Sequence, residues 1–264
     1  MQIFQDKVVW ITGASSGIGK EIAIQCAQQG AKIVLSARNE AKLLEVKEEL
    51  SSKDKHFVLP LDLEQNDGFD TLVNKVISKY GSVDFLFNNG GLSQRSEAAE
   101  TPLSVDRKIM EINYFGNIAL TKAVLPFFQK QQSGHIIVIS SIAGKFGFYL
   151  RSAYSASKHA LQGFYESLLL EEKKNNLKVL LVYPGKINTP ISTNALTKEG
   201  KAHGVMDHNQ ETGMSVEECV SKLLKAVEKN KKEVLIGNKE IKAVALKRFL
   251  PKLFWKVIAK QKAT

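Results

Sequence analysis

Short apolar runs alternate with longer amphipathic runs from the first residues of the chain to about residue 237. The short runs are rich in Val, Ile, Leu and Phe, which is typical of parallel strands that are covered by helices on both faces. The longer runs have the length of helices. This alternation predicts an α/β fold in which one doubly wound, seven-stranded parallel sheet has helices on both faces.

The periodicity also predicts where each element lies. The expected strands are residues 7–12, 31–36, 56–61, 83–88, 135–140, 178–183 and 233–236. The expected helices are residues 17–29, 40–51, 68–80, 102–131, 152–175 and 216–230. No Pro-rich or Ser-rich linker interrupts them, so we expect one domain over residues 1–238 and an extension over residues 239–264.

A glycine-rich turn follows the first expected strand and precedes an amphipathic helix: Thr12-Gly13-Ala14-Ser15-Ser16-Gly17-Ile18-Gly19. Glycines there allow a tight turn, a close approach of the backbone to a pyrophosphate, and packing of the helix on the strand. The helix N-terminus adds N–H donors and a positive dipole. The turn therefore predicts a dinucleotide site in a Rossmann-type domain.

The spacing Thr-Gly-x-x-x-Gly-x-Gly resembles that of the classical short-chain dehydrogenase/reductase family. Further motifs of that family occur in the same order, and the resemblance covers about residues 5–237. They are Asn88-Asn89-Gly90-Gly91, Asn113, Ser141, Tyr154-Ser155-Ala156-Ser157-Lys158, and Pro184-Gly185 with Thr189. The one departure is Gly90, where the family usually has alanine, and we expect the lost methyl to loosen the turn slightly. Within the family, the chain most resembles the dehydrogenase/reductase member-seven group.

The resemblance implies an oxidoreductase whose catalytic residues are Asn113, Ser141, Tyr154 and Lys158. Tyr154 and Lys158 stand four residues apart on an expected helix and therefore share a face. Because a neighbouring ammonium favours the phenolate, we expect Lys158 to lower the pKa of Tyr154, which then acts as acid and base. Ser141 is expected to hydrogen-bond the substrate oxygen, and Asn113 to hold a water that relays protons to Lys158.

The same resemblance assigns the residues that bind a nicotinamide dinucleotide. They are Gly13, Ser15, Ser16, Gly17, Ile18, Gly19, Arg38, Asp62, Asn89, Tyr154, Lys158, Pro184, Gly185, Ile187 and Thr189. Asp62 has a second interpretation as the N-cap of a helix that starts at Leu63, and the two roles can coexist. We expect no metal, because His203 and His208 have no partner motif and hydride chemistry needs none.

The residue after the second strand decides which dinucleotide is favoured. A carboxylate usually stands there and binds the free adenosine ribose, but this chain has Ala37. Arg38 follows, and its guanidinium suits a 2′-phosphate. NADP(H) is therefore favoured over NAD(H). Ser15 opposes this preference, because many NADP-dependent relatives carry a second base at that position.

Apolar side chains predict the substrate pocket. Ser141 and Tyr154 are expected to contact a small hydrophobic alcohol or carbonyl compound, with Phe148 and Ile191 on the pocket wall. Other candidates for the wall are Leu92, Phe146, Tyr149, Leu150 and Leu196. The long loop 186–214 follows a strand's carboxyl end and is expected to be a lid, mobile until substrate binds.

The formal net charge is +10, and +7 of it lies in residues 239–264. Basic and apolar residues interleave in this extension, which fits a helix packed on the body or on another subunit, or a helix on a membrane surface. A nucleic-acid contact is disfavoured, because the charge is confined to the extension and no recognition motif is present.

The N-terminal residues lack the pattern of a signal peptide, and no apolar run approaches the length of a membrane span. We therefore expect a cytoplasmic protein, peripheral at a membrane if the extension binds one. Cys26 and Cys219 have no metal-like spacing and are expected to be buried free thiols. The family resemblance implies a homodimer or homotetramer.

The function these features favour is NADP(H)-dependent interconversion of a hydrophobic secondary alcohol and its ketone or aldehyde. The alternative is a non-catalytic, nucleotide-bound sensor or scaffold that uses the basic extension to bind a partner. The retained Ser141, Tyr154 and Lys158 argue against that alternative, because a scaffold needs no competent proton relay.

Overall fold

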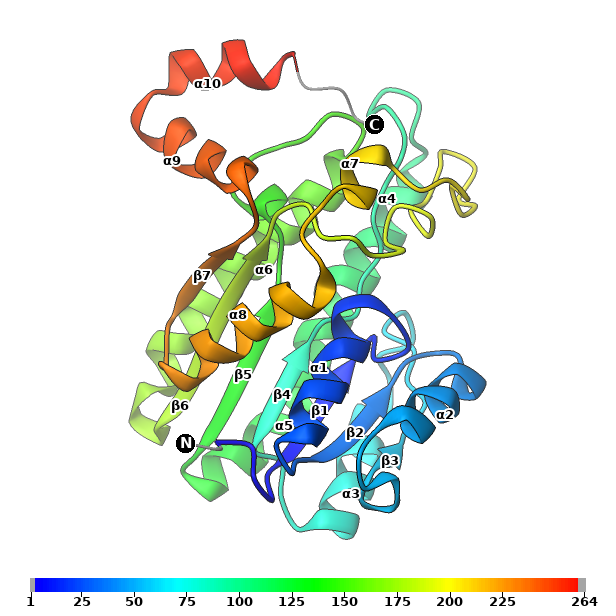
Figure 1. Ribbon diagram of the computed structural model, residues 1–264, viewed down its shortest axis with the longest axis vertical. Helices are drawn as coiled ribbons and strands as arrows, with labels where there is room; N and C mark the ends of the chain where they lie inside the picture. Colours follow the sequence, from blue (N-terminus) through cyan, green and yellow to red (C-terminus); the bar gives the residue numbers. More distant parts are fainter. Residues whose placement is uncertain (1–2, 261–264) are drawn as a thin grey trace.

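The computed structural model describes residues 3–260, without the side chain of Asn209. Its centre is a seven-stranded parallel sheet in the order β3-β2-β1-β4-β5-β6-β7 (Figure 1). The strands are β1 (Val8–Thr12), β2 (Lys32–Ser36), β3 (Phe57–Val58), β4 (Phe85–Asn88), β5 (Gly134–Ile139), β6 (Leu177–Pro184) and β7 (Glu233–Ile236). The strand order reverses between β1 and β4, so the expected doubly wound fold is confirmed.

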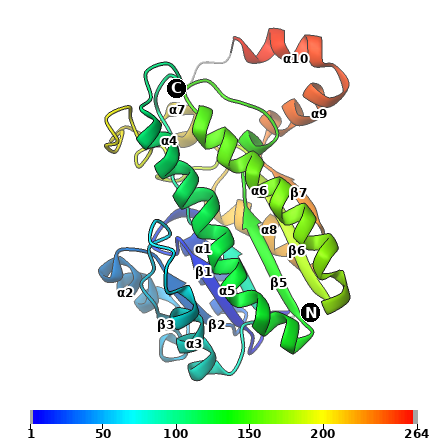
Figure 2. The same ribbon diagram turned by 180° about the vertical axis from the view of Figure 1, so that it is seen from behind.

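Helices cover both faces of the sheet. One face carries α1 (Gly17–Gln28), α2 (Glu40–Glu49) and α8 (Val216–Glu228) (Figure 1). The other face carries α3 (Phe69–Tyr80), α5 (Gly116–Gln131) and α6 (Ser152–Glu171) (Figure 2). The helix α4 (Leu103–Met110) precedes α5 and packs in a small separate apolar cluster with Ala153 and Leu196. Each layer has its own apolar core, in which strand residues alternate between the two faces. Cys26 and Cys219 lie in the first core as buried free thiols, as expected.

The third strand is shorter than its sequence predicts. Pairing with β2 covers Phe57 and Val58 only, although Leu59 and Leu61 still donate single hydrogen bonds to the carbonyls of Leu35 and Ala37. Pro60 lies between them and has no N–H, which an edge strand tolerates. The chain therefore leaves the sheet early and enters the turn that carries Asp62.

The expected helix over residues 102–131 is interrupted. A π-helical turn, Glu111–Phe115, separates α4 from α5. Asn113 lies in this turn and is fully buried. Gly116 then starts α5 so close to another segment that an added Cβ would lie 2.1 Å from the carbonyl oxygen of Leu63. Such turns are frequent at functional sites, and single-sequence periodicity does not reveal them.

The extension forms a 3-10 turn, Lys239–Ile241, and two short helices, α9 (Lys242–Phe249) and α10 (Pro251–Ile258). They lie beyond β7, at the edge of the sheet where its strands end (Figure 1). Residues 261–264 of the extension lie outside the described residues. Across residues 3–260, no helix is both long and apolar enough to cross a membrane.

Two glycines provide a test of the packing. Gly116→Ala should lower the free energy of unfolding by about 1–3 kcal/mol, because its Cβ collides with backbone that cannot rotate away. Gly163→Ala in α6 should raise it by as much as about 1 kcal/mol, because an added Cβ meets no atom within 4 Å and alanine favours helix. Urea unfolding followed by circular dichroism measures both; equal stability of the two variants would contradict this packing at Gly116.

Candidate active site

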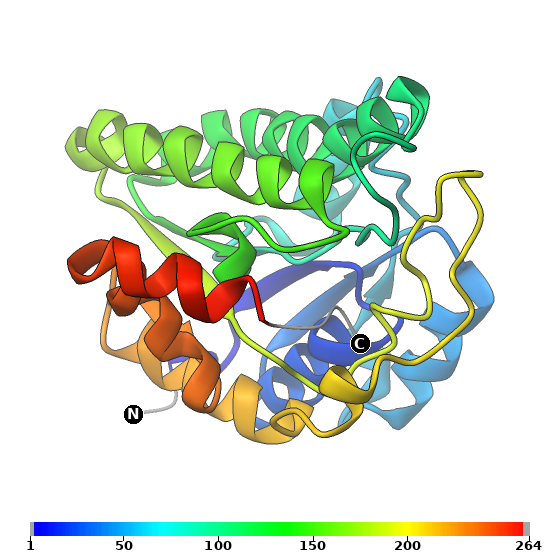
Figure 3. The same cartoon turned by 90° about the horizontal axis from the view of Figure 1, so that it is seen from above.

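A large cavity opens where the parallel strands end, with a volume of about 1780 Å³. The glycine turn, the ends of β4, β5 and β6, the 186–214 loop and the C-terminal helices all contribute to its lining. Seen along the strands, the loop lies on one side of this edge and α9 and α10 on the other (Figure 3). In doubly wound sheets, ligands bind at this edge, next to the point where the strand order reverses.

The glycine turn has the backbone geometry that its sequence predicts. Gly13 and Gly17 have φ angles of +64° and +51°, a region that side chains other than glycine rarely occupy. Gly19 lies in the first turn of α1, close to the end of β1, where an added Cβ would lie 2.3 Å from the carbonyl oxygen of Gly13. The glycines thus serve the tight turn and the close packing of helix on strand.

A second turn, after β4, holds the first in place. The side-chain amide of Asn89 donates to the carbonyl oxygens of Thr12 and Gly13, at 3.0 and 3.2 Å. In return, the Thr12 hydroxyl accepts from the backbone N–H groups of Asn89 and Gly90, at 3.0 and 2.9 Å. Sequence reasoning missed the role of Thr12.

The departure at Gly90 has a local cause. An added Cβ there would lie 2.6 Å from Cδ1 of Leu63, so the Leu63 side chain occupies the space that the family's usual methyl would fill. The looser turn expected from the missing methyl stays a prediction.

All the expected dinucleotide-binding residues except Gly19 line the cavity. The residues fit a bound dinucleotide, since the turn leaves backbone rather than side chains facing the space before α1. Asp62 also faces the cavity, and its carboxylate accepts from the backbone N–H of Glu64 at 3.0 Å. No helix starts at Leu63, so Asp62 caps a turn and its N-cap interpretation is wrong.

At the far end of the cavity, Ala37 and Arg38 follow β2 as expected. Lys42 lines the same region and adds a second basic side chain, which sequence reasoning missed because it searched for that base in the glycine turn. The Asn39 side chain caps α2 by accepting from the backbone N–H of Lys42 at 3.0 Å, which fixes the approach of this helix. Glu40 lines the same region and opposes the two bases.

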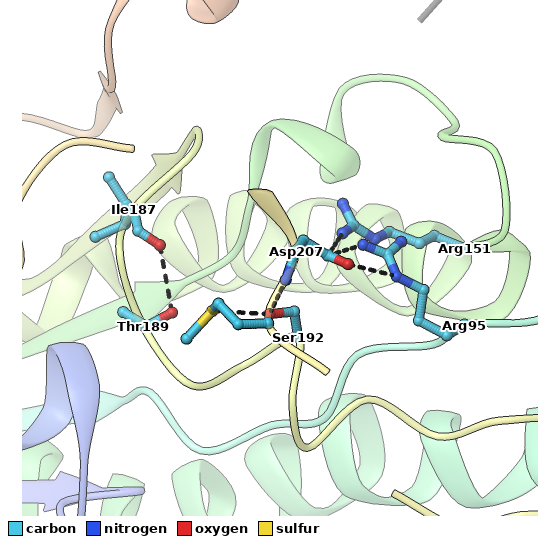
Figure 4. Close-up of polar contacts among 7 residues, drawn as sticks. Arg95, Arg151, Ile187, Thr189, Ser192 and Asp207 are labelled. Atoms are coloured by element: carbon cyan, nitrogen blue, oxygen red, sulfur yellow. Dashed lines mark hydrogen bonds and ion pairs between the residues drawn. The ribbon is translucent and has the colours of Figure 1, made fainter. Parts of the chain in front are cut away.

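At the opposite end, the segment after β6 crosses the cavity. The Thr189 hydroxyl donates to the Ile187 carbonyl oxygen at 3.5 Å (Figure 4). Gly185 lets the Glu240 carboxylate approach the backbone, because an added Cβ would lie 2.2 Å from its Oε1 atom. The same oxygen accepts from the N–H of Lys186 at 2.9 Å. The start of the C-terminal extension therefore braces this part of the site.

Three of the four expected catalytic residues, Ser141, Tyr154 and Lys158, line one end of the cavity, whereas Asn113 is fully buried behind its wall. Tyr154 and Lys158 come from the first turns of α6, and Ser141 follows β5. The Ser141 hydroxyl donates to the Pro184 carbonyl oxygen at 3.5 Å and accepts from the N–H of Ala143 at 3.1 Å, and it lies near enough to Tyr154 to lower the pKa of the phenol. The Lys158 ammonium donates to the Ile139 carbonyl oxygen at 2.9 Å and lies 5.8 Å from the centre of the Tyr154 ring.

Burial dominates the proton affinities of this pair. It raises the pKa of Tyr154, whereas the nearby Ser141 hydroxyl and the positive charge of Arg151 lower it. Burial also lowers the pKa of Lys158 to about 8. The expectation that Lys158 is the cation that lowers the pKa of Tyr154 is not what the structure shows, because that cation is Arg151.

Asn113 joins the segment after β4 to helix α6. Its Oδ1 atom accepts from the N–H of Leu92 at 2.7 Å, and its Nδ2 atom donates to the Leu92 carbonyl and the Ser157 hydroxyl, at 2.8 and 3.0 Å. Gly91 lies against it, since an added Cβ would be 2.9 Å from Asn113 Oδ1 and 3.6 Å from Lys158 Nζ. Its water-mediated relay to Lys158 stays a prediction.

Gln94 is a positioning residue that sequence reasoning missed. Its buried Oε1 atom accepts from the N–H groups of Ala153 and Tyr154, at 2.8 and 3.3 Å. These N–H groups belong to the first turn of α6, which has no partners within the helix. Gln94 therefore sets the position of Tyr154, and only contacts between segments 59 and 60 residues apart reveal it.

Most of the apolar residues expected in the substrate pocket line the cavity. Phe148 and Ile191 line the cavity, together with Leu92, Phe146, Tyr149 and Leu196. Leu150 does not line it and has a φ angle of +61°, in the turn that leads from Tyr149 to α6. The interpretation of Leu150 as a wall residue is therefore wrong.

The lid loop has definite anchors. Asp207 in this loop is buried between Arg95 and Arg151, which approach from the segments after β4 and before α6 (Figure 4). Arg95 Nε donates to Asp207 Oδ1 at 3.2 Å, and its Nη2 atom pairs with Oδ2. Arg151 Nη2 donates to Oδ2 at 3.1 Å. We call this buried cluster the lid latch.

A backbone bridge reinforces the lid latch. The Leu196 carbonyl accepts from the N–H of Arg95 at 2.8 Å, and its own N–H donates to the Ser93 carbonyl at 2.9 Å. Burial lowers the pKa of Arg95 to about 10, and the charge of Arg151 adds to this effect. The lid latch could not be found from sequence, because its members are 56 and 112 residues apart from one another.

The described residues bring no three His, Cys, Asp or Glu side chains together as a metal site. His159 hydrogen-bonds the Ser155 carbonyl oxygen at 2.8 Å.

Comparisons with known proteins agree with this geometry. A family profile described as short chain dehydrogenase matches residues 7–200. The chain is 41% identical over 261 residues to a dehydrogenase/reductase SDR family protein 7-like of Drosophila melanogaster, covering 97% of this chain and 80% of that protein. It is likewise 41% identical over 261 residues to the dehydrogenase/reductase SDR family member 7B of Mus musculus, covering 97% and 81%. The expected member-seven resemblance is confirmed.

Solved structures share the fold. A short-chain dehydrogenase from Streptomyces avermitilis superposes with a TM-score of 0.82 at 27% identity, over 97% of this chain and 98% of that one. A short chain dehydrogenase/reductase from Burkholderia phymatum, in complex with NAD, gives a TM-score of 0.85 at 21% identity, over 95% of each chain.

The lid latch yields a prediction. Asp207→Asn removes the anion that two buried guanidiniums share, so the free energy of unfolding should fall by about 3–5 kcal/mol. Limited trypsin digestion should cut faster at Lys198 and Lys201 in the loop. Glu100→Gln is the matched control, because it breaks an exposed ion pair to Lys198 in the same loop and should change little. Equal effects of the two variants would contradict the lid latch.

Proposed function

The chain belongs to the short-chain dehydrogenase/reductase family, an NAD(P)-dependent oxidoreductase family, and we propose that it interconverts a hydrophobic secondary alcohol and its carbonyl compound with NADP(H). One observation carries this proposal: Tyr154 is buried at one end of the cavity, where Ser141 also lines the wall and Lys158 from the next turn of the same helix lies beside it.

The chain's own residues supply the proton chemistry. Ser141 binds the substrate oxygen and stabilises charge that develops on it. Tyr154 donates a proton to that oxygen during reduction and removes one from the alcohol during oxidation. The nicotinamide, when bound, supplies or accepts the hydride. Residues Gly13, Gly17 and Asn89 hold the dinucleotide's phosphate side through the shape of the first turn, and Lys158 holds its ribose.

The proton affinity of Tyr154 favours one direction near neutral pH. Because burial raises its pKa, the phenol is protonated there and ready to donate. The rate of reduction should therefore be level near neutrality and fall once alkaline pH removes the proton. Oxidation needs the phenolate, so its rate should rise with pH over the same range.

The apolar lining supports the substrate class. Phe146, Phe148, Leu92 and Ile191 face the cavity beside Ser141 and Tyr154. Such a wall binds the hydrocarbon part of a substrate, and a few polar groups set the orientation of that substrate.

Arg38 and Lys42 support NADP(H) over NAD(H). Both line the end of the cavity next to Ala37, where a carboxylate would repel a 2′-phosphate. Glu40 at the same rim opposes this preference, so the arginine's bidentate fit to phosphate has to outweigh it. No observation favours the sensor or scaffold alternative.

Tyr154→Phe tests the chemistry. It should lower kcat/KM for a hydrophobic ketone by about 10² to 10⁴, because the proton donor is lost. The Kd for NADPH, measured by fluorescence titration, should stay within about threefold because the lysine and both turns remain. Tyr80→Phe is the control, since Tyr80 lies at the end of α3 and bonds only the Lys55 carbonyl among the described residues. Unchanged turnover in Tyr154→Phe would refute the role of Tyr154.

Cofactor preference is tested separately. Ala37→Asp should raise the Kd for NADPH at least about tenfold, through repulsion of the 2′-phosphate, and lower that for NADH. Arg38→Gln should raise the Kd for NADPH by about tenfold and leave the Kd for NADH nearly unchanged. Fluorescence titration with both dinucleotides measures the ratio. If the wild type prefers NADH, the proposed preference is refuted while the family's chemistry still stands.

A further inference from the structure

The two C-terminal helices present an apolar surface to solvent. Phe249 at the end of α9 is 73% exposed, and Leu250 follows it in the turn. In α10, Leu253 and Trp255 are 47% and 60% exposed. We call the exposed side chains of Phe249, Leu250, Leu253 and Trp255 the tail face. Large side chains this exposed, and clustered within seven residues, mark an interaction surface.

Basic residues surround the tail face. Between residues 241 and 260 there is no acidic residue, and the basic ones are Lys242, Lys247, Arg248, Lys252, Lys256 and Lys260. In α10, Lys252 and Lys256 lie one turn apart on the side opposite the buried Phe254, with Leu253 and Trp255 flanking them. An exposed helix with aromatic and basic residues side by side has the composition of one that lies at a lipid interface.

The body of the protein holds the tail face in place. The Phe254 ring is only 1% exposed and packs on the Phe146 ring, with centroids 5.1 Å apart. The Lys247 ammonium donates to the Lys145 carbonyl at 3.0 Å. The Glu240 carboxylate accepts from Lys186 at the other end of the extension. The outward side chains are thus fixed in orientation by contacts on the inner side.

The tail face borders the opening of the active-site cavity. Leu246, Phe249, Leu250, Val257 and Ile258 line that cavity from the side of the extension. Phe146, which carries the ring against Phe254, lines it as well. An apolar path therefore connects the surface of α9 and α10 with the wall of the substrate pocket.

We propose that the tail face docks on an anionic lipid bilayer, so that the mouth of the cavity opens at the membrane surface. The apolar side chains enter the boundary between headgroups and acyl chains, and the lysines pair with anionic headgroups. This docking is independent of the hydride chemistry and would remain if the proposed substrate class proved wrong.

Charge argues for lipid over a second copy of the chain. A two-fold symmetric contact places the same surface on both sides, and would bring exposed basic residues such as Lys252 and Lys256 near those of the second copy, with no acid between 241 and 260 to compensate. Nucleic acid would satisfy the lysines but leaves exposed aliphatic side chains such as Leu250 and Leu253 without a partner. An anionic bilayer satisfies both kinds of side chain.

Vesicle flotation with the full chain tests the proposal. Wild type should float with vesicles of phosphatidylcholine and about 30% phosphatidylserine, and bind at least about tenfold less to phosphatidylcholine alone. About 0.5 M KCl should weaken the binding, since it screens the lysines. Leu253→Ser with Trp255→Ser, and separately Lys252→Glu with Lys256→Glu, should each reduce binding at least about tenfold. None of these four residues lines the cavity.

Matched controls lie elsewhere on the surface. Leu170→Ser removes a 76% exposed apolar side chain on α6, and Lys173→Glu with Lys174→Glu reverses two exposed charges next to it. These should float like wild type, and thermal unfolding should show that every variant is folded.

Two results would overturn the proposal. One is equal flotation of wild type and both tail variants. The other is a change in molar mass by light scattering, without lipid, when Leu253 and Trp255 are replaced, because that result assigns the tail face to a second copy.

Discussion

The hydrogen bonds between the turns after β1 and β4 are the constraint on which the rest of the site depends. Thr12 and Asn89 join these turns, which shapes the glycine turn and sets the path of the next residues. Three residues on, both backbone groups of Leu92 bond Asn113, which in turn donates to Ser157. The Ser157 hydroxyl donates to the Tyr154 carbonyl at 2.7 Å. Buried and partly buried hydrogen bonds, joined by the backbone from Asn89 to Leu92, therefore link the glycine turn to the helix that carries Tyr154, and such networks lose most when one partner is missing.

Ion pairs hold the 186–214 loop, whereas hydrogen bonds between side chains and backbone hold the glycine turn. Asp207 is shared by two guanidiniums, and burying such charges is costly unless they are paired. The observed position of the 186–214 loop is therefore favoured only while all three side chains meet. Arg151 also lowers the pKa of Tyr154, so one side chain both anchors the loop and acts on this tyrosine.

Sequence reasoning succeeded where local pattern and spacing carry the information. The βα alternation, the glycine turn and the Tyr154–Lys158 spacing on one helix were all recognisable, because each depends on residues close together in the chain. It failed where distant segments meet. The π-helical turn at Asn113, the cap that Gln94 places on α6, and the lid latch all arise from contacts across 21 to 112 residues. Lys42 was missed for a different reason, since its side chain reaches the cavity from the first turn of α2.

The sequence by itself determined the fold class and the family, because strand and helix periods and fixed motif spacings depend on residues close together in the chain. Only the tertiary structure decided how the side chains at the cavity are tuned and enclosed. Burial lowers the pKa of Lys158 and raises the pKa of Tyr154. Burial depends on how the whole chain packs. The same holds for the C-terminal extension, whose composition left several interpretations open. Packing of Phe254 on Phe146 determined which of its side chains face the body and which face solvent.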